Sequence, residues 1–373
     1  MSDEQRLLKE NIDRLAMANS RFAAAKPALA GSDGDAWKQF AELGLLGLPF
    51  AESEGGFGGG PVELMIVGEA LGRHLCLIPY NACIALTGSL LTLGATAEQR
   101  QPLLPGIMQG SCIPALAHQE PTSRYDLADV QTTARKTADG WVLSGKKSGV
   151  IAGDRATAFV VSARVSGTRF DQDGIGLFWV DAKTPGILKR TYVAQDDTGG
   201  AEINLSDIVV GAEARIDAVD HGYNVIERAA EVAVAASLSE CVGLMEAMLQ
   251  ITTDYLKTRK QFGKKIGEFQ ALQHRAADML VATELGRSMA YYAASMVGNS
   301  KSHERRKAIS AAKVQVSESL SFVANNAVQL HGGIGVTEEC AIGPYFKRAT
   351  VIETFLGDAD HHLAQFLATD GLT

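Results

Sequence analysis

The sequence predicts an α+β protein in which a helical region is followed by a β domain and then by a second helical region. Apolar residues recur at helical spacing in the first and last thirds of the chain. In the middle third they alternate or form short β-branched runs between turns. The 373 residues exceed what one core usually serves. We therefore expect three domains, over residues 1–111, 112–212 and 213–373.

The first domain, residues 1–111, is expected to be helical. One helix is indicated by four apolar residues at helical spacing, namely Trp37, Phe40, Leu43 and Leu45. The segment ELMIVGEALGRHL, residues 63–75, has the pattern of a second, amphipathic helix. Thr96 and Gln99 have the spacing of a capping box ahead of another apolar run.

The middle domain, residues 112–212, is expected to be a small antiparallel β domain. The stretch QTTARKTADGWVLSGKK, residues 131–147, is typical of a hairpin with its turn at Gly140. Further strands are predicted at short, regular spacing, namely residues 157–164, 174–182 and 201–210.

The last domain, residues 213–373, is expected to be a four-helix bundle. Long apolar-periodic runs cover residues 222–257, 270–297 and 306–329, and short loops join them. A last, shorter helix carries Leu363, Phe366 and Leu367. Long helices joined by short loops are typical of a bundle.

Composition excludes several kinds of protein. The net charge of −8 argues against nucleic acid as a partner, which requires a basic face. No apolar run reaches about 18 residues, so no membrane span is expected. The charged N-terminus is not that of a signal peptide. The five cysteines include no CxxC pair, which favours free thiols in the cytoplasm over a zinc site.

Two segments of the last domain have a composition suited to binding a dinucleotide. In TRKQFGKKIGEFQALQHRAADM, residues 258–279, Arg259 can pair with a pyrophosphate and Phe262 can pack on an adenine. In QLHGGIGVTEE, residues 329–339, glycines let the backbone approach a ligand closely. Taken singly, each segment has a simpler interpretation: a solvated basic helix end, and a helix C-cap followed by a turn.

Together with ELGLLGLPFAESEGGFGG, residues 42–59, and the order of the domains, these segments resemble the acyl-CoA dehydrogenase family. The resemblance covers nearly the whole chain and implies an acyl-CoA dehydrogenase-like fold, an acyl-CoA substrate and FAD as cofactor. It also implies a dimer of dimers, a role in fatty acid metabolism and electron-transfer flavoprotein or a similar acceptor as partner. In the family, such segments hold the adenosine and pyrophosphate end of an FAD bound mainly to the neighbouring subunit. The residues that correspond here are Arg259, Gln261, Phe262, Gln329, Gly332 and Gly333.

The catalytic base of the family has no counterpart in the sequence. Members remove the α proton of a thioester with a carboxylate while the β hydride passes to the flavin. That glutamate usually directly precedes a glycine, where this chain has Leu356 before Gly357. The alternative family position, on the first long helix, falls near Ala233 and Val234. Three nearby glutamates are interpreted as surface or ion-pair residues, with the last two as secondary candidates for a base: Glu227, Glu231 and Glu240. No catalytic residue is assigned.

The positions that contact the flavin ring also differ from the family pattern. TEPGAGSD appears here as QEPTSRYD, residues 119–126, without the threonine and both glycines. The Trp-Ile-Thr strand end corresponds to Gly149, Val150 and Ile151, so that an aromatic wall and a hydroxyl donor are missing.

The segment VIETFLGDADHH, residues 351–362, carries charges that do not suit a phosphate. Asp358 and Asp360 fall where the family has neutral residues near the FAD phosphates, and carboxylates there would repel them. His361 and His362 point about 100° apart on a helix, so no metal site is expected. We interpret these residues as the solvated start of a helix.

Three functions remain open. The chain is either an active dehydrogenase with a relocated base or a non-catalytic subunit that supplies the FAD adenosine site and the scaffold to a larger homologue. It resembles the small subunit of heteromeric acyl-CoA dehydrogenases, such as the pimeloyl-CoA type. A flavin reaction without α-proton abstraction, such as desulfination, is the third possibility. DNA binding, known in one branch of the family, is disfavoured by the charge of −8.

Overall fold

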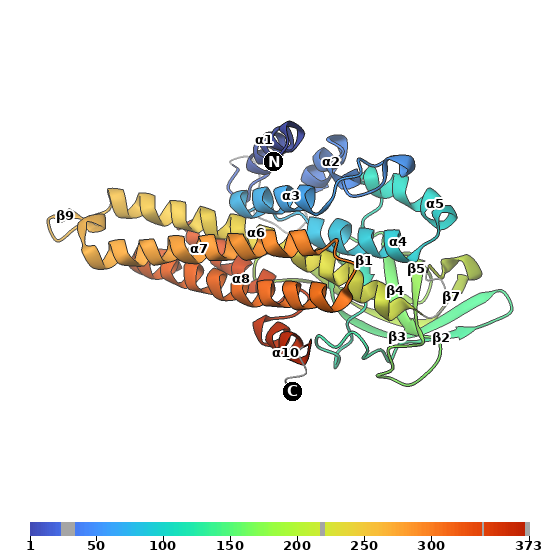
Figure 1. Ribbon diagram of the computed structural model, residues 1–373. Coiled ribbons are helices and arrows are strands. Elements are labelled where there is room, and N and C mark those ends of the chain that lie inside the picture. The colour runs from blue at the N-terminus through green and yellow to red at the C-terminus, as the bar shows by residue number, and fades with distance from the viewer. Residues whose placement is uncertain (24–33, 217–220, 338, 370–373) are drawn as a thin grey trace. The chain divides into compact units, whose positions relative to one another are not determined.

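The computed structural model describes residues 1–23, 34–216, 221–337 and 339–369 (Figure 1). The chain forms two compact units that are each discontinuous in sequence. The first, here called the bundle unit, comprises Met1–Lys26, Pro61–Leu77 and Val234–Thr373. The second, the sheet unit, comprises Pro27–Gly60 and Ile78–Ala233. The domain boundaries after residues 111 and 212 stay predictions.

The bundle unit is built of long helices. Its described helices are α1 (Asp3–Ala18), α3 (Pro61–His74), α6 (Gly222–Thr258, from Val234 on), α7 (Gln270–Met296), α8 (Ser302–His331), α9 (Ile342–Glu353) and α10 (Ala359–Thr369). Short 3-10 turns also occur, η5 (Ile266–Glu268) and η6 (Gly332–Val336). All four predicted helices are present. The prediction missed α9, because Gly343 and Pro344 in its first turn hide the periodicity; proline is tolerated there.

Helices α3 and α6 lie in close contact in the bundle unit. A Cβ atom at Gly72 would collide with the carbonyl of Glu240, and one at Gly243 with the carbonyl of Glu69. Glycine at these two positions therefore lets the two backbones touch. By length and composition α6 could also cross a membrane, and it is the one described helix that passes this test. Because 83% of its most apolar window is buried, α6 has the environment of a core helix.

The sheet unit combines a curled seven-stranded sheet with short helices. The strands are β1 (Pro114–Ala117), β2 (Thr133–Lys136), β3 (Gly140–Ile151), β4 (Ala158–Arg164), β5 (Ile175–Asp181), β6 (Ile187–Val193) and β7 (Gly199–Gly211). The helices are α2 (Gly34–Glu42), the π-helix η3 (Asn81–Gly88), α4 (Ser89–Gly94), α5 (Ala97–Met108) and the 3-10 turns η1 (Leu45–Gly47), η2 (Glu52–Glu54) and η4 (Ala212–Ala214). The first residues of α6 also belong to this unit.

The predicted local features of the sheet unit are confirmed, but its pairing is mixed. Thr96 and Gln99 form both hydrogen bonds of the capping box at the start of α5. Strands β2 and β3 form the predicted hairpin, with Gly140 at its turn. Strand β1, however, runs parallel to β4. Strand β2 also runs parallel to β4 where the two make a short contact. The hairpin β2–β3 separates β1 from β4 in sequence, and a connection of that length permits a parallel pair.

Candidate cofactor site and base position

A tight hairpin with an exposed aromatic tip follows α6. The short strands β8 (Lys260–Gln261) and β9 (Lys264–Lys265) pair directly. Phe262 and Gly263 form the turn with φ of +54° and +79°, and two positive φ values are what a two-residue hairpin favours. Phe262 is 88% exposed and makes an edge contact with Phe269, at 6.1 Å between ring centroids.

The second segment contains three glycines, Gly332, Gly333 and Gly335. The structural reason for glycine differs among them. Gly335 lies against the backbone of α8, where a Cβ would be 2.7 Å from the Val328 carbonyl. Gly332 has a φ of +65°, which favours glycine. Gly333 has neither constraint: its φ lies outside the left-handed range, and a Cβ would meet no atom within 4 Å. The chain's own packing therefore gives no reason for glycine at position 333.

The end of α6, which leads into the first segment, lies against the end of α8, which leads into the second, at one end of the bundle. Tyr255, one turn before Arg259, stacks on His331 with ring centroids 4.4 Å apart, although 76 residues separate them. The hairpin extends beyond the ends of α6 and α7 (Figure 1). The six predicted cofactor residues are all exposed: Arg259, Gln261, Phe262, Gln329, Gly332 and Gly333. A guanidinium, an exposed aromatic ring and an open glycine backbone fit an adenosine diphosphate moiety.

The position of the family base, by contrast, is held from inside the protein. Leu356 lies in the turn between α9 and α10 with a φ of +55°. Its carbonyl lies 3.1 Å from Nε2 of His362. Nζ of Lys313 donates to the carbonyls of Ile352 and Phe355, at 3.4 Å each. Lys313 is almost fully buried, and this burial lowers its pKa. The turn is therefore fixed through its backbone, while its side chain at position 356 cannot accept a proton.

The residues after this turn are not all solvated, which corrects our interpretation of the segment. Asp358 caps α10 by accepting a hydrogen bond from the amide of His361, at 2.8 Å. His362 is 5% exposed and also contacts Ser310 Oγ. Burial, with a further contribution from nearby Lys313, lowers the pKa of His362 to about 3. Among the described residues, no group of three or more His, Cys, Asp or Glu could hold a metal ion.

The alternative base position offers no free carboxylate. Ala233 and Val234 are buried apolar residues. Glu240 on α6 forms a buried ion pair with Arg348 on α9, at 2.6 Å. Glu231 pairs with Arg228, at 3.1 Å. These glutamates are thus ion-pair residues, as one of our interpretations expected, but they are buried rather than on the surface.

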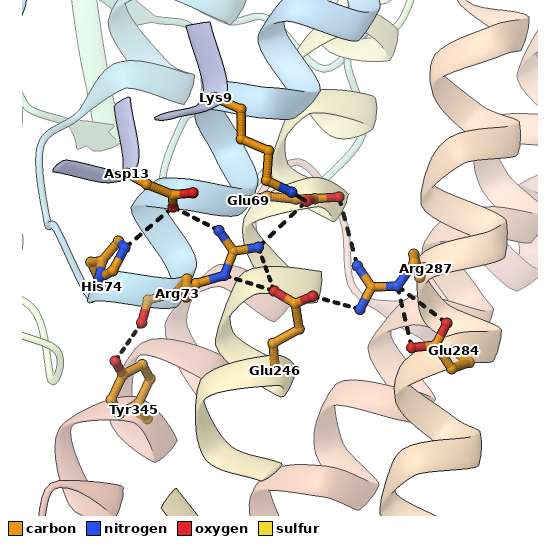
Figure 2. Close-up of polar contacts among 9 residues, drawn as sticks. All are labelled: Lys9, Asp13, Glu69, Arg73, His74, Glu246, Glu284, Arg287 and Tyr345. Carbon is orange, nitrogen blue, oxygen red and sulfur yellow. Dashed lines mark hydrogen bonds and ion pairs between the residues drawn. The ribbon is translucent and has the colours of Figure 1, made fainter. Parts of the chain in front are cut away.

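The bundle unit also contains a cluster of ion pairs that the sequence did not predict (Figure 2). Arg73 on α3 bridges Asp13 on α1, at 2.7 Å, and Glu246 on α6, at 2.6 Å. Arg287 on α7 binds the other oxygen of Glu246, at 2.6 Å. Burial, and secondly the charge of Glu246, raises the pKa of neighbouring Glu69. The side chains point toward one another, so the cluster joins four helices and its carboxylates are engaged within the protein.

In the sheet unit, Gly149 stands where the family has an aromatic residue against the flavin. The space beside it is taken by another side chain of this chain. Gly149 has a φ of +62°, and a Cβ there would lie 3.1 Å from Oε1 of Gln119. Nearby, buried Lys147 donates to Glu120, at 2.8 Å, and to Ser162. Burial lowers the pKa of Lys147 to about 8, against the opposing effect of the Glu120 charge. A large side chain at position 149 would therefore need both a strained backbone and a displaced Gln119.

Comparison with known proteins agrees with this architecture. The acyl-CoA dehydrogenase N-terminal, middle and C-terminal domain models match residues 2–111, 115–208 and 220–368. The probable acyl-CoA dehydrogenase YngJ of Bacillus subtilis is 29% identical over 87% of this chain and 86% of its own length. The caffeyl-CoA reductase–Etf complex subunit CarC of Acetobacterium woodii is also 29% identical, over 86% of this chain and 85% of its own.

Solved structures share the whole fold. The steroid ACAD Tcur3481-Tcur3483 superposes with a TM-score of 0.85 and 29% identity, covering 99% of this chain and 98% of that one. A glutaryl-coenzyme A dehydrogenase complex with glutaryl-CoA has a TM-score of 0.92 at 22% identity, covering 100% and 96%. With three consecutive domain models matched over nearly its full length, the chain belongs to the acyl-CoA dehydrogenase family.

Proposed function

We propose that this chain is a subunit of a flavin-dependent acyl-CoA dehydrogenase that supplies the adenosine and pyrophosphate end of an FAD site and does not itself remove the substrate α proton. One observation carries the proposal. The segments that would hold the adenosine end are open and exposed, while the position of the base is a leucine fixed by the chain's own buried groups.

The cofactor side of the proposal rests on Arg259, Phe262 and Gly333. The guanidinium would pair with the pyrophosphate, the ring would cover the adenine, and the open glycine would admit a phosphate or ribose at its backbone. When bound, FAD supplies the hydride acceptor of the reaction. In the family this end of the cofactor extends from the neighbouring subunit, which accords with the exposure of these residues.

The catalytic side of the proposal concerns what the chain lacks. The α proton of a thioester is too weakly acidic to leave without a base and a polarised carbonyl. Leu356 provides no base, and Glu240 is engaged by Arg348. Proton abstraction therefore requires another chain, for which we propose a larger homologue with a glutamate before the glycine of this turn.

The assembly and its partners follow from the same proposal. A dimer of dimers with the homologue, in the cytoplasm and in acyl-CoA metabolism, would give one complete FAD site per heterodimer. A relative is a subunit of a complex with Etf, which supports electron-transfer flavoprotein as the electron acceptor. The steroid ACAD Tcur3481-Tcur3483 carries a paired name, which supports a two-chain enzyme.

The test is binding of the two halves of the cofactor to the purified chain, measured by calorimetry. We expect ADP, which represents the adenosine end, to bind. We expect FMN, which carries the flavin ring and one phosphate, to bind at least about tenfold more weakly, a difference of ~1.4 kcal/mol. Preferential FMN binding, or turnover of an acyl-CoA by the chain alone, would favour an active dehydrogenase with a relocated base and contradict the proposal.

A further inference from the structure

The stack of Tyr255 on His331 joins the two candidate cofactor segments. The rings are nearly parallel, with 24° between their planes. The Tyr255 hydroxyl donates to the His331 carbonyl, at 3.4 Å. His331 is 6% exposed, and its Nδ1 lies 2.8 Å from the Ala327 carbonyl. Because a carbonyl only accepts, Nδ1 carries a proton and the ring orientation is fixed.

Each ring is connected through the backbone to one segment. The Tyr255 carbonyl accepts the amide of Arg259, at 2.8 Å, in the last turn of α6. His331 directly precedes Gly332, and its Cβ would lie 3.1 Å from a Cβ at Gly335. A displacement of either ring therefore changes where Arg259 lies relative to the glycines.

The tips of the segments are open on their outer side, although the hairpin is also held by the pairing of β8 with β9. Gly263, Gly332 and Gly333 would each have open space around an added Cβ, and Phe262 is 88% exposed. Open segments bind a ligand well only when they are held in the bound geometry beforehand, since ordering them on binding reduces the affinity. A rigid contact at their base is what supplies such preorganisation.

We propose that Tyr255 and His331 are a positioning pair that sets the separation of Arg259 from Gly332 and Gly333, and so the affinity for the adenosine diphosphate end of the cofactor. The inference rests on the function proposed above. Neither ring contacts the cofactor in this account. Their effect passes through the backbone of the residues that do.

If the stack were only core packing, its loss would lower the stability of the bundle unit and leave the affinity of the folded protein unchanged. The two roles are separated by measuring ADP affinity by calorimetry and the melting temperature for each variant. Tyr255→Phe keeps the ring, whereas Tyr255→Leu removes it. His331→Asn removes the other ring but keeps a side-chain N–H close to the Ala327 carbonyl, so it provides a second, milder variant.

We expect Tyr255→Leu and His331→Asn each to weaken ADP binding by about five- to tenfold, the effect of an aromatic pair. The double variant should be little worse than either single one, and Tyr255→Phe should stay within about twofold of the wild type. Normal ADP affinity in folded Tyr255→Leu or His331→Asn, together with weak binding in Arg259→Glu, would overturn the positioning role alone. Normal affinity in Arg259→Glu as well would instead refute the proposed function.

Discussion

The hairpin at residues 260–265 and the turn at Leu356 belong to the same unit but differ in how far their own chain surrounds them. In the hairpin the side chains are exposed, and a Cβ added at Gly263, Gly332 or Gly333 would meet no described atom within 4 Å. At the turn, Lys313 and His362 bind the backbone carbonyls from inside, and Gly357 is covered by both histidine rings. One region is left open for something outside the chain, and the other is filled by the chain itself.

This difference is the observation behind our proposal that the chain supplies the adenosine end of a cofactor site and not the catalytic base. The residues that would bind the cofactor of a neighbouring subunit match the family pattern. The residues that would act in a reaction on this chain differ from that pattern, and other residues of the chain surround them. In the sheet unit Gly149 repeats the second case, since Gln119 lies against the position of the missing aromatic wall.

The largest effect is expected from the enclosed ion pair of Glu240 and Arg348. Arg348→Met leaves a buried carboxylate without its partner, and breaking such a pair costs about 3–5 kcal/mol. Urea unfolding should show this loss, and the double variant with Glu240→Gln should recover a large part of it. If Arg348→Met unfolds at the wild-type urea concentration, Glu240 is not held as described and returns as a candidate base.

In the open region, Arg259→Glu should reduce FAD affinity by about 100-fold, because it replaces a charge-assisted pair with the pyrophosphate by repulsion. Lys257→Glu is the matched control, since it makes the same change of charge two residues away on an exposed side chain. It should stay within about threefold of the wild type at 0.15 M salt. Equal losses in the two variants would indicate a diffuse charge effect rather than a site at Arg259.

A smaller and more selective effect is expected at Gly333. Gly333→Ala should leave the free energy of unfolding unchanged or raised by up to about 1 kcal/mol, because the methyl group meets no atom of the chain. It should weaken FAD binding about fivefold if a ligand lies against this backbone. Gly298→Ala is the control, since its Cβ also has open space but it lies at the other end of α8. Equal FAD affinity in both variants would remove Gly333 from the site.

The smallest effect concerns the ion-pair cluster of Figure 2 in acid. Burial raises the pKa of Asp13, but His74 and Arg73 lower it by more, so that the pKa in the folded protein is below the usual value. Its stabilisation is therefore complete above a pH of about 4 and is lost as the pH falls through the folded pKa.

For a half-exposed group the effect is about 1 kcal/mol or less. Asp13→Asn should lower the melting temperature at pH 7 and make little difference near pH 2. Asp3→Asn on the same helix, in an exposed pair with Arg6, should change neither. A constant difference between Asp13→Asn and the wild type at both pH values would show that the effect is not one of charge.

Local features of the sequence predicted most of the fold. The long helices, the capping box of α5 and the hairpin at Gly140 each depend on residues close in sequence. The parallel pairing of β1 with β4 and the cluster around Arg73 depend on residues far apart, whose partners no local pattern specifies. The burial of His362 was missed for the same reason, because Ser310 and Lys313 come from another helix.

The sequence predicted the candidate site to a similar extent as the fold. The motifs identified Arg259 and Gly333 as candidate cofactor-binding residues. Their role in binding FAD stays a prediction. The contact that joins their segments, between Tyr255 and His331, has no signal in the spacing. The leucine at the base position could be recognised only because a family pattern existed for comparison, since a leucine before a glycine is otherwise unremarkable.

The central claim is that this chain contributes half of a cofactor site to a partner and has no turnover of its own. The most direct measurement is flavin stoichiometry together with acyl-CoA turnover, using an artificial electron acceptor, on the purified chain alone and after assembly with a homologue that carries the glutamate. We expect well below one FAD per chain and no turnover alone, then about one FAD per heterodimer with turnover. A homotetramer that holds one FAD per subunit and turns over an acyl-CoA at ~10 s⁻¹ would contradict the claim.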